Sequence, residues 1–171
     1  YYPRRLPAEV LLDAIDGLTG MPTNFPDLPP GTRATSLPDN SYNRTTALLK
    51  VFGRPEGLSV CECERVDSAS LAQSLHLLNS ADIKGKLSGG SSRAERLVKS
   101  GGTDAEKIRS LYFTAFSRPP TAEESKEAEE YLKRPLADAK GEPVDPLKAK
   151  RISLEDLLWA LMNAKEFLYN H

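Results

Sequence analysis

The sequence has little of what marks several specialised classes of protein. Its 171 residues include two cysteines, two histidines and one tryptophan, and its longest apolar run is only a few residues. A helix that crosses a bilayer needs about 20 consecutive apolar residues, so we expect no direct membrane insertion. A chain of this length buries roughly 70% of its unfolded surface, so it should fold without disulfide bonds.

The charge balance argues against a polyanionic partner. Lys and Arg number 23 against 24 for Asp and Glu, which leaves a formal net charge of −1. A nearly neutral chain has no field to hold a polyanion, so we expect no nucleic-acid partner. The length suits a single helical domain over residues 1–171. The sequence begins at Tyr1 with neither a start methionine nor a charged-then-apolar leader, which predicts a soluble piece of a larger protein.

Helix-forming patterns and prolines divide the N-terminal part of the chain into a predicted helix, a loop and a second, short helix. Pro7 stands where the first turn of a helix tolerates proline, and Leu11, Ile15 and Leu18 follow on one face before Gly20. Five prolines between residues 20 and 40 oppose both helix and central strand, which predicts a long Pro-rich loop. Residues 44–52 then predict a short helix.

Capping signals predict the helices of the C-terminal half. A hydroxyl residue followed three positions later by an acid forms a capping box, in which each side chain bonds the other residue's backbone N–H. Apolar residues recur at helical spacing after residues 108 and 154. Residues 138–151 are polar, with one glycine and two prolines, and predict an exposed loop. The three capping-box pairs are Thr103 with Glu106, Thr121 with Glu124, and Ser153 with the shorter acid Asp156.

Together these patterns predict an all-α fold: a single-domain, irregular array of about six to eight helices with the long Pro-rich loop. The alternation of period two that marks strands is nearly absent. A sheet of three or more strands would contradict this prediction. The strongest apolar positions should share one core: Leu11, Ile15, Leu75, Leu78, Leu111, Tyr112, Leu158 and Leu161.

The densest group of chemically capable residues lies between residues 61 and 79. Both cysteines and one of the two histidines fall in this stretch, together with several charges. In an extended segment, Cys61, Cys63 and Arg65 would share one side, and we expect Arg65 to be held by an acid or a carbonyl oxygen. The candidate functional cluster comprises Cys61, Glu62, Cys63, Glu64, Arg65, His76 and Asn79.

This cluster does not complete a known reactive set. Structural zinc takes four ligands, and Cys61, Cys63 and His76 supply three, so we predict no metal site. A nucleophile, a base and an orienting group are present in type, but sequence spacing does not bring them together. Free thiols are the favoured state of the cysteines; a strained disulfide between them, a metal or an outside partner are the alternatives. The motif that attaches c-type haem is absent, and no cofactor is predicted.

Six segments carry a family resemblance: residues 2–9 (YPRRLPAE), 52–55 (FGRP), 61–65 (CECER), 75–79 (LHLLN), 117–121 (SRPPT) and 166–171 (EFLYNH). Together they resemble the planctomycete-specific domain of unknown function 1553 family, over essentially the whole chain. The resemblance implies a C-terminal position in a large exported protein of the periplasm or cell envelope. Members commonly carry a second planctomycete domain of unknown function, and often a cytochrome or carbohydrate-binding-like module. The resemblance supplies no activity and no catalytic residues.

Two functional hypotheses from different classes follow. In the first, the chain is a non-catalytic helical accessory or interaction domain that packs on upstream domains of the same polypeptide and is inactive alone. In the second, the region from Cys61 to Asn79, with Arg4, Arg5 or Arg33, contributes to a shared active or cofactor site of a multidomain envelope enzyme acting on polysaccharide or in electron transfer. A deep pocket lined by these residues would favour the second. Neither hypothesis specifies a small-molecule ligand.

Overall fold

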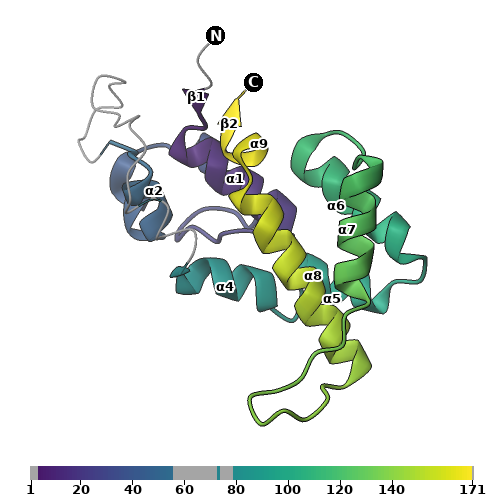
Figure 1. Cartoon of the computed structure of the whole chain (residues 1–171). Helices are drawn as coiled ribbons and strands as arrows, with labels where there is room; N and C mark the ends of the chain where they lie inside the picture. The colour runs from purple at the N-terminus through teal and green to yellow at the C-terminus, as the bar shows by residue number, and fades with distance from the viewer. Residues whose placement is uncertain (1–3, 56–72, 74–78, 171) are drawn as a thin grey trace.

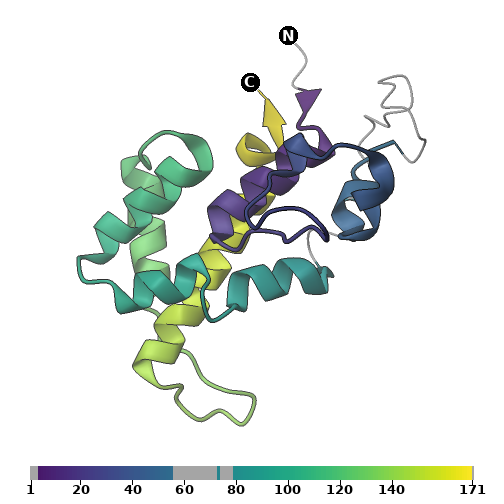
Figure 2. The same ribbon diagram turned by 180° about the vertical axis from the view of Figure 1, so that it is seen from behind.

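A computed structural model describes residues 4–55, 73 and 79–170 of the chain. These residues are predominantly helical, which confirms the all-α prediction, and their only sheet consists of two strands of two residues each. A long helix, α8, runs diagonally through the molecule and α1 packs against it (Figures 1 and 2). The described elements are β1 (Arg4–Arg5), α1 (Ala8–Thr19), η1 (Ala34–Ser36), η2 (Asn40–Arg44), α2 (Ala47–Val51), α4 (Ala81–Ser88), α5 (Arg93–Lys99), α6 (Asp104–Phe116), α7 (Ala122–Leu132), α8 (Pro146–Asn163), α9 (Lys165–Leu168) and β2 (Tyr169–Asn170).

Helix α1 lies at the centre of the N-terminal half because its apolar residues recur at helical spacing. It begins directly after Pro7 and ends at Gly20, whose φ of 67° lies in the left-handed region. The N–H of Gly20 donates to the carbonyl oxygen of Asp16 at 2.8 Å. A residue with a Cβ would be strained at that φ, so the glycine determines where the helix ends. Four of its apolar side chains are fully buried: Leu11, Leu12, Ile15 and Leu18.

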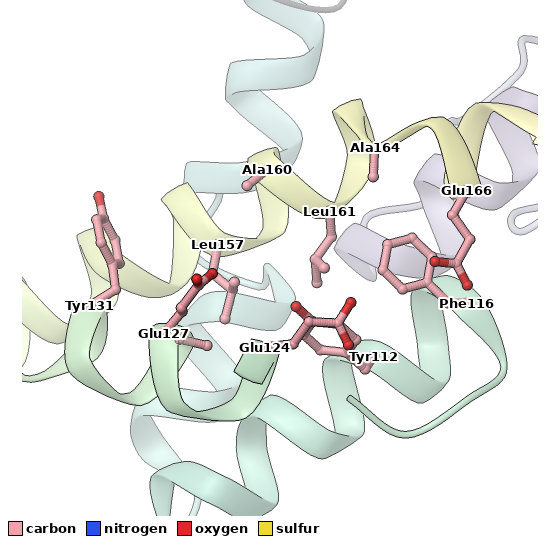
Figure 3. A pocket seen from close by; sticks show the side chains of 11 residues that line it. Tyr112, Phe116, Glu124, Glu127, Tyr131, Leu157, Ala160, Leu161, Ala164 and Glu166 are labelled. Carbon is pink, nitrogen blue, oxygen red and sulfur yellow. The ribbon is translucent and has the colours of Figure 1, made fainter. Parts of the chain in front are cut away.

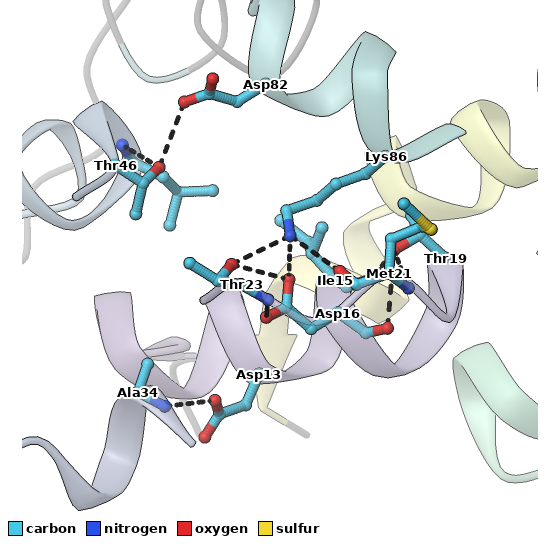
Figure 4. Close-up of polar contacts among 11 residues, drawn as sticks. Asp13, Ile15, Asp16, Thr19, Met21, Thr23, Ala34, Thr46, Asp82 and Lys86 are labelled. Carbon is cyan, nitrogen blue, oxygen red and sulfur yellow. Dashed lines mark hydrogen bonds and ion pairs between the residues drawn. The ribbon is translucent and has the colours of Figure 1, made fainter. Parts of the chain in front are cut away.

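Two 3-10 helices, η1 and η2, lie between α1 and α2. Helix η1 falls between the prolines, and the carboxylate of Asp13 accepts the N–H of Ala34 at 2.6 Å (Figure 4) and the hydroxyl of Thr35 at 2.8 Å. The stretch therefore contains short regular turns that its proline content does not predict, because such a turn needs only a few residues free of proline. Helix α2 is shorter than the predicted 44–52 because the hydroxyl of Thr46 caps it by accepting the N–H of Leu48 at 3.3 Å.

Helix α5 is anchored to the C-terminal end of α1. The guanidinium of Arg93 donates to the carbonyl oxygens of Leu18 at 2.7 Å and Gly17 at 2.8 Å. These carbonyls belong to the last turn of α1, where a helix lacks internal donors and carries partial negative charge. Arg93 therefore supplies hydrogen-bond donors to the last carbonyl groups of α1 and holds α5 against this end of the helix.

Helices α6 and α7 begin where the capping boxes predict. The hydroxyls of Thr103 and Thr121 accept the N–H groups of Glu106 and Glu124, in both cases at 3.2 Å. The two glutamates in return accept the backbone N–H of their threonine at 2.7 Å. Each helix start thus satisfies two of its orphan donors with its own side chains.

Helix α8 begins earlier than the sequence predicts. The carboxylate of Asp145 accepts the N–H groups of Leu147 and Lys148, each at 3.1 Å, and Pro146 occupies the first helical position. Proline is suited to that position because its missing N–H would have no helical partner there. Ser153, the predicted start, is instead buried inside the helix. The prediction of an exposed loop over residues 138–151 is therefore wrong from residue 146 onward, since an Asp cap followed by proline forms a complete start signal upstream of Ser153.

The two ends of the described chain lie side by side (Figures 1 and 2). Strands β1 and β2 pair antiparallel, with Arg4 opposite Asn170 and Arg5 opposite Tyr169. The N–H of Leu6 extends this pairing by donating to the carbonyl oxygen of Leu168 at 2.9 Å. The C-terminal helices are thereby tied to the start of α1.

The buried apolar residues form one cluster. The predicted core members Leu11, Ile15, Leu111, Tyr112, Leu158 and Leu161 all belong to it. Leu75 and Leu78 lie outside the described residues. Within the part of the chain that the structure describes, no helix has the length and apolar character that crossing a membrane requires.

Candidate functional site

Most of the candidate cluster lies outside the described residues. This applies to Cys61, Glu62, Cys63, Glu64, Arg65 and His76. Asn79 is described; it is exposed and directly precedes Ser80, the N-cap of α4. The arrangement of the cluster therefore stays a prediction.

The arginines of the second hypothesis lie in different settings. Arg4 and Arg33 are exposed, whereas Arg5 is half-buried. The guanidinium of Arg5 donates to the side-chain oxygen of Gln73 and to the carbonyl oxygen of Phe52, the latter at 3.4 Å, and lies 5.4 Å from the centre of the Phe52 ring. Gln73 is buried, and its amide nitrogen donates to the carbonyl oxygen of Val51 at 3.1 Å. Arg5 thus helps to join β1 to the end of α2.

A buried ion pair joins α1 to the residues after α2. The Nε of Arg54 lies 3.1 Å from an Oε of Glu9, and the two side chains are 4% and 10% exposed. The other guanidinium nitrogens of Arg54 donate to the side chain of Asn43 and to the carbonyl oxygen of Asp39, each at 3.0 Å. Sequence reasoning missed this pair, although Glu9 and Arg54 both belong to segments that carry the family resemblance.

A second polar network fastens α4 to α1, as Figure 4 shows. The Nζ of Lys86 lies 2.6 Å from the carboxylate of Asp16 and donates to the hydroxyl of Thr23 at 2.9 Å and the carbonyl oxygen of Met21 at 2.8 Å. Asp16 also accepts the N–H of Thr23 at 2.7 Å. These contacts join α4 to the last turns of α1 and to the residues that follow α1.

The candidate site is an open pocket of about 380 Å³ between α6, α7, α8 and α9 (Figure 3). Leu157 and Leu161 of α8 point toward α6 and α7, and Phe116 lines the pocket from α6. Small side chains at Ala160 and Ala164 leave the space open along α8. The complete lining is Tyr112, Phe116, Glu124, Glu127, Ala128, Tyr131, Leu157, Ala160, Leu161, Ala164 and Glu166, which does not include Asn79.

Arg118 binds two of the carboxylates that line the pocket. Its guanidinium donates two hydrogen bonds to Glu124, at 2.8 and 2.9 Å, and two to Glu166, both at 2.7 Å. It also lies 5.7 Å from the centre of the Tyr112 ring and 5.4 Å from that of Phe116. The hydrogen bonds that Arg118 donates lower the pKa of Glu124 to about 2, and acceptance of these bonds by both glutamates raises the pKa of Arg118 above its ordinary value.

The α7 side of the pocket is polar. Glu127 is exposed and takes part in no ion pair among the described residues. One turn further along α7, the hydroxyl of Tyr131 donates to the carboxylate of Asp156 at 2.8 Å, which raises the pKa of the tyrosine and ties α7 to α8. The pocket therefore combines an apolar floor with an acidic edge.

The pocket is better suited to binding than to proton transfer. A general base should have a pKa close to the working pH, whereas the pKa of the Glu124 carboxyl lies far below neutrality. Glu166 is likewise hydrogen-bonded to Arg118. Across the described ranges, no group of three or more His, Cys, Asp or Glu side chains is placed to hold a metal ion. An apolar group flanked by a positive charge would find complementary surroundings here.

Sequence reasoning missed this pocket. In the sequence, the segments 117–121 and 166–171 carried the family resemblance, and neither was predicted to be part of a site. The structure shows that Arg118 and Glu166 connect these two segments, both of which carry the family resemblance. The signal that could have found the site is this association of an arginine and an acid in two distant, distinctive segments.

The sequence matches a protein-family model over residues 1–132, which is more than half of the chain. The family is PSD1, described as "Protein of unknown function (DUF1553)". The matched range includes Arg118, Glu124 and Glu127 and ends at the last residue of α7. No curated protein and no solved structure matches the chain. The chain belongs to the DUF1553 family.

Proposed function

We propose that this chain is a non-catalytic helical interaction domain that packs on upstream domains of a larger exported polypeptide. The exported setting, in the periplasm or cell envelope, follows the resemblance carried by the six sequence segments. The interaction role follows the character of the described surface. The two parts of the proposal are therefore supported separately.

The open pocket between α6, α7 and α8 is the observation that carries the interaction role. Its apolar floor is open to solvent at one side, with Leu157 half-buried and Ala160 exposed. Covering apolar surface stabilises a complex by about 25 cal/mol for each Å² removed from water. Another domain that covered this pocket would therefore gain binding free energy without any rearrangement of the helices.

The surrounding ionic contacts support a structural rather than a catalytic use of the charged residues. Arg118, Arg54 and Lys86 each bind carboxylates of the same domain. Strong contacts of this kind hold side chains in place and shift carboxyl pKa values away from neutrality, as at Glu124. Rigid helices that present an apolar pocket are typical of binding modules.

Association between the two parts of the larger polypeptide tests this function. The upstream part would be expressed separately and titrated with this chain by isothermal titration calorimetry. We expect one-to-one binding with a negative heat-capacity change, because apolar surface is buried. If the two parts do not associate while both are folded, the proposed function is wrong.

A further inference from the structure

We propose that the pocket binds a basic segment of an upstream domain. One aliphatic or aromatic side chain of that segment enters between α7 and α8, and a lysine or arginine close to it pairs with Glu127. The identity of the source rests on the proposed function. The chemistry of the segment is argued from the pocket itself.

The size and lining of the pocket suit a large apolar side chain together with part of its neighbouring residue. Its volume of about 380 Å³ lies at the low end of the range of roughly 300–1,000 Å³ found for ligand sites. The side chains that line this part of the pocket are Leu157, Ala160 and Leu161 of α8 and Ala164, which directly follows the helix (Figure 3). Two alanines among them allow an incoming group to approach the backbone of α8 closely. An apolar group would displace water there without leaving a buried polar atom unpaired.

The negative charge at the edge of the pocket favours a positively charged residue next to the apolar side chain that enters the pocket. Three glutamates line the pocket, and Arg118 is the cation that binds two of them. These four groups leave a formal charge of −2. Glu127 carries its charge at the exposed edge, on the same helix as Tyr131. A lysine or arginine would be attracted to this edge and an acidic segment would be repelled, so the edge discriminates between partners of opposite charge.

The geometry of Arg118 keeps the pocket ready for binding. Four hydrogen bonds fix Glu166 at the Nε and Nη2 atoms of the guanidinium and Glu124 at its Nη1 and Nη2 atoms, and the edge-to-face contact of Tyr112 with Phe116, at 5.5 Å between ring centres, fixes the aromatic wall. A preformed wall loses little conformational freedom when a partner binds. The incoming cation is therefore expected to pair with Glu127, while Arg118 keeps its present partners.

Synthetic peptides provide the first test. The basic probe is a capped octapeptide with a central leucine flanked by lysines; one comparison peptide carries glutamates in place of the lysines and another carries serine in place of the leucine. Binding would be followed by ¹H–¹⁵N chemical shifts of the complete 171-residue chain. We expect shifts at α7 and α8 with the basic peptide, and affinity at least about tenfold weaker for both comparison peptides. Equal affinity for all three, or no shifts with the basic peptide at millimolar concentration, would overturn the proposal.

Matched variants assign the site. Ala160→Phe fills the pocket from an exposed position, and Ala105→Phe makes the same change on the exposed start of α6. Glu127→Gln removes the charge at the edge, and Glu142→Gln removes an exposed charge outside the pocket. We expect Ala160→Phe to weaken binding of the basic peptide at least about tenfold and Glu127→Gln about two- to fivefold. The two control variants should bind like the unmodified chain, and binding unaffected by the pocket variants would refute the assignment.

The test also separates the upstream segment from a second copy of this chain. Leu147 is 66% exposed and is followed by Lys148, so a second copy also offers an apolar side chain next to a cation. Leu147→Asp should leave binding of the basic peptide and of the upstream part unchanged. If the chain instead self-associates and Leu147→Asp abolishes this, the occupant is a second copy and the proposal is wrong. If the upstream part binds equally well to Ala160→Phe, the pocket assignment fails and the proposed function stands.

Discussion

At the residue scale, arginines with several acceptors connect segments that are distant in the sequence. Arg54 joins the end of α2 to Glu9 in the first turn of α1, and Arg118 joins the α6–α7 connection to Glu166 of α9. Arginine suits this role because its planar guanidinium donates in several directions from one position. These residues therefore hold the helices in register around the core.

The buried pair of Glu9 and Arg54 should contribute strongly to stability. Arg54→Ala would remove the guanidinium from a carboxylate that is almost fully buried, and breaking such a pair costs about 3–5 kcal/mol. Urea denaturation monitored by circular dichroism measures this loss directly. Arg33→Ala, at an exposed arginine, should change the free energy of unfolding by less than about 0.5 kcal/mol. Equal effects of the two substitutions would show that the Glu9–Arg54 contact has no special importance.

The pair of Glu124 and Arg118 should make stability depend on pH. The pKa of Glu124 falls from 4.5 to about 2 in the folded chain, so its contribution is complete above pH 4.5 and is lost as the pH falls toward about 2. Glu124→Gln keeps a side-chain acceptor for the N–H of Thr121 but does not titrate. Thermal melting across this range should show a smaller pH dependence for Glu124→Gln than for the unmodified chain. The neighbouring substitution Glu123→Gln should leave the pH dependence unchanged; the reverse result would contradict the assigned cause.

These residue contacts mark the limit of what the sequence predicts. Thr103 and Glu106 could be paired from the sequence because they lie in one helical turn, where spacing fixes geometry. Glu9 and Arg54 are separated by most of α1, the irregular stretch and α2, and no spacing rule applies across such a distance. Their contact depends on how the helices pack, which the apolar pattern specifies only as a shared core.

At the element scale, the helices form where local signals agree with the apolar spacing. The predicted starts of α6 and α7 are confirmed. Each helix begins there because a complete capping box directly precedes its apolar stripe. The predicted start of α8 was wrong because two start signals precede the same stripe. The upstream signal, Asp145 with Pro146, prevails since a helix extended to Asp145 gains further turns without losing the buried positions of Leu154 and Leu158.

The two possible starts of α8 predict a different order of stability for two variants, Asp145→Ala and Ser153→Ala. Asp145→Ala should lower the free energy of unfolding by about 1 kcal/mol, because the N–H groups of Leu147 and Lys148 lose their acceptor. Ser153→Ala should have the smaller effect, since alanine is the better helix former at an interior position. Chemical denaturation of the two variants compares them. A larger loss at Ser153 would indicate that the first turns of α8 contribute little.

At the scale of the whole molecule, the first and last described segments of the chain are in contact. Pairing of β1 with β2 and the bond from Leu6 to Leu168 connect the first and last described residues. The C-terminal helices α8 and α9 then complete the pocket whose other wall is formed by α6 and α7. The sequence predicted the helical class and the six core positions that the structure describes, but not this pocket, because the pocket's members come from several helices and include no unusual residue type.

This 171-residue chain should bind neither zinc nor iron stoichiometrically. The sequence offers Cys61, Cys63 and His76 as ligands, one short of a structural zinc site. Elemental analysis of the purified chain should give well below one equivalent of either metal. One equivalent that disappears when Cys61 and Cys63 are replaced by serine would instead favour the shared active or cofactor site.

Hydrogen–deuterium exchange on the proposed larger polypeptide tests the central claim most directly, because it reports whether the pocket is covered when the proposed upstream domains are present. We predict slower amide exchange in α7 and in the pocket-facing part of α8, near Leu157 and Leu161, than in this chain alone. The same comparison on the Ala160→Phe variant should show that protection reduced. Identical exchange of α7 and α8 in the complete polypeptide and in the isolated chain would contradict the account.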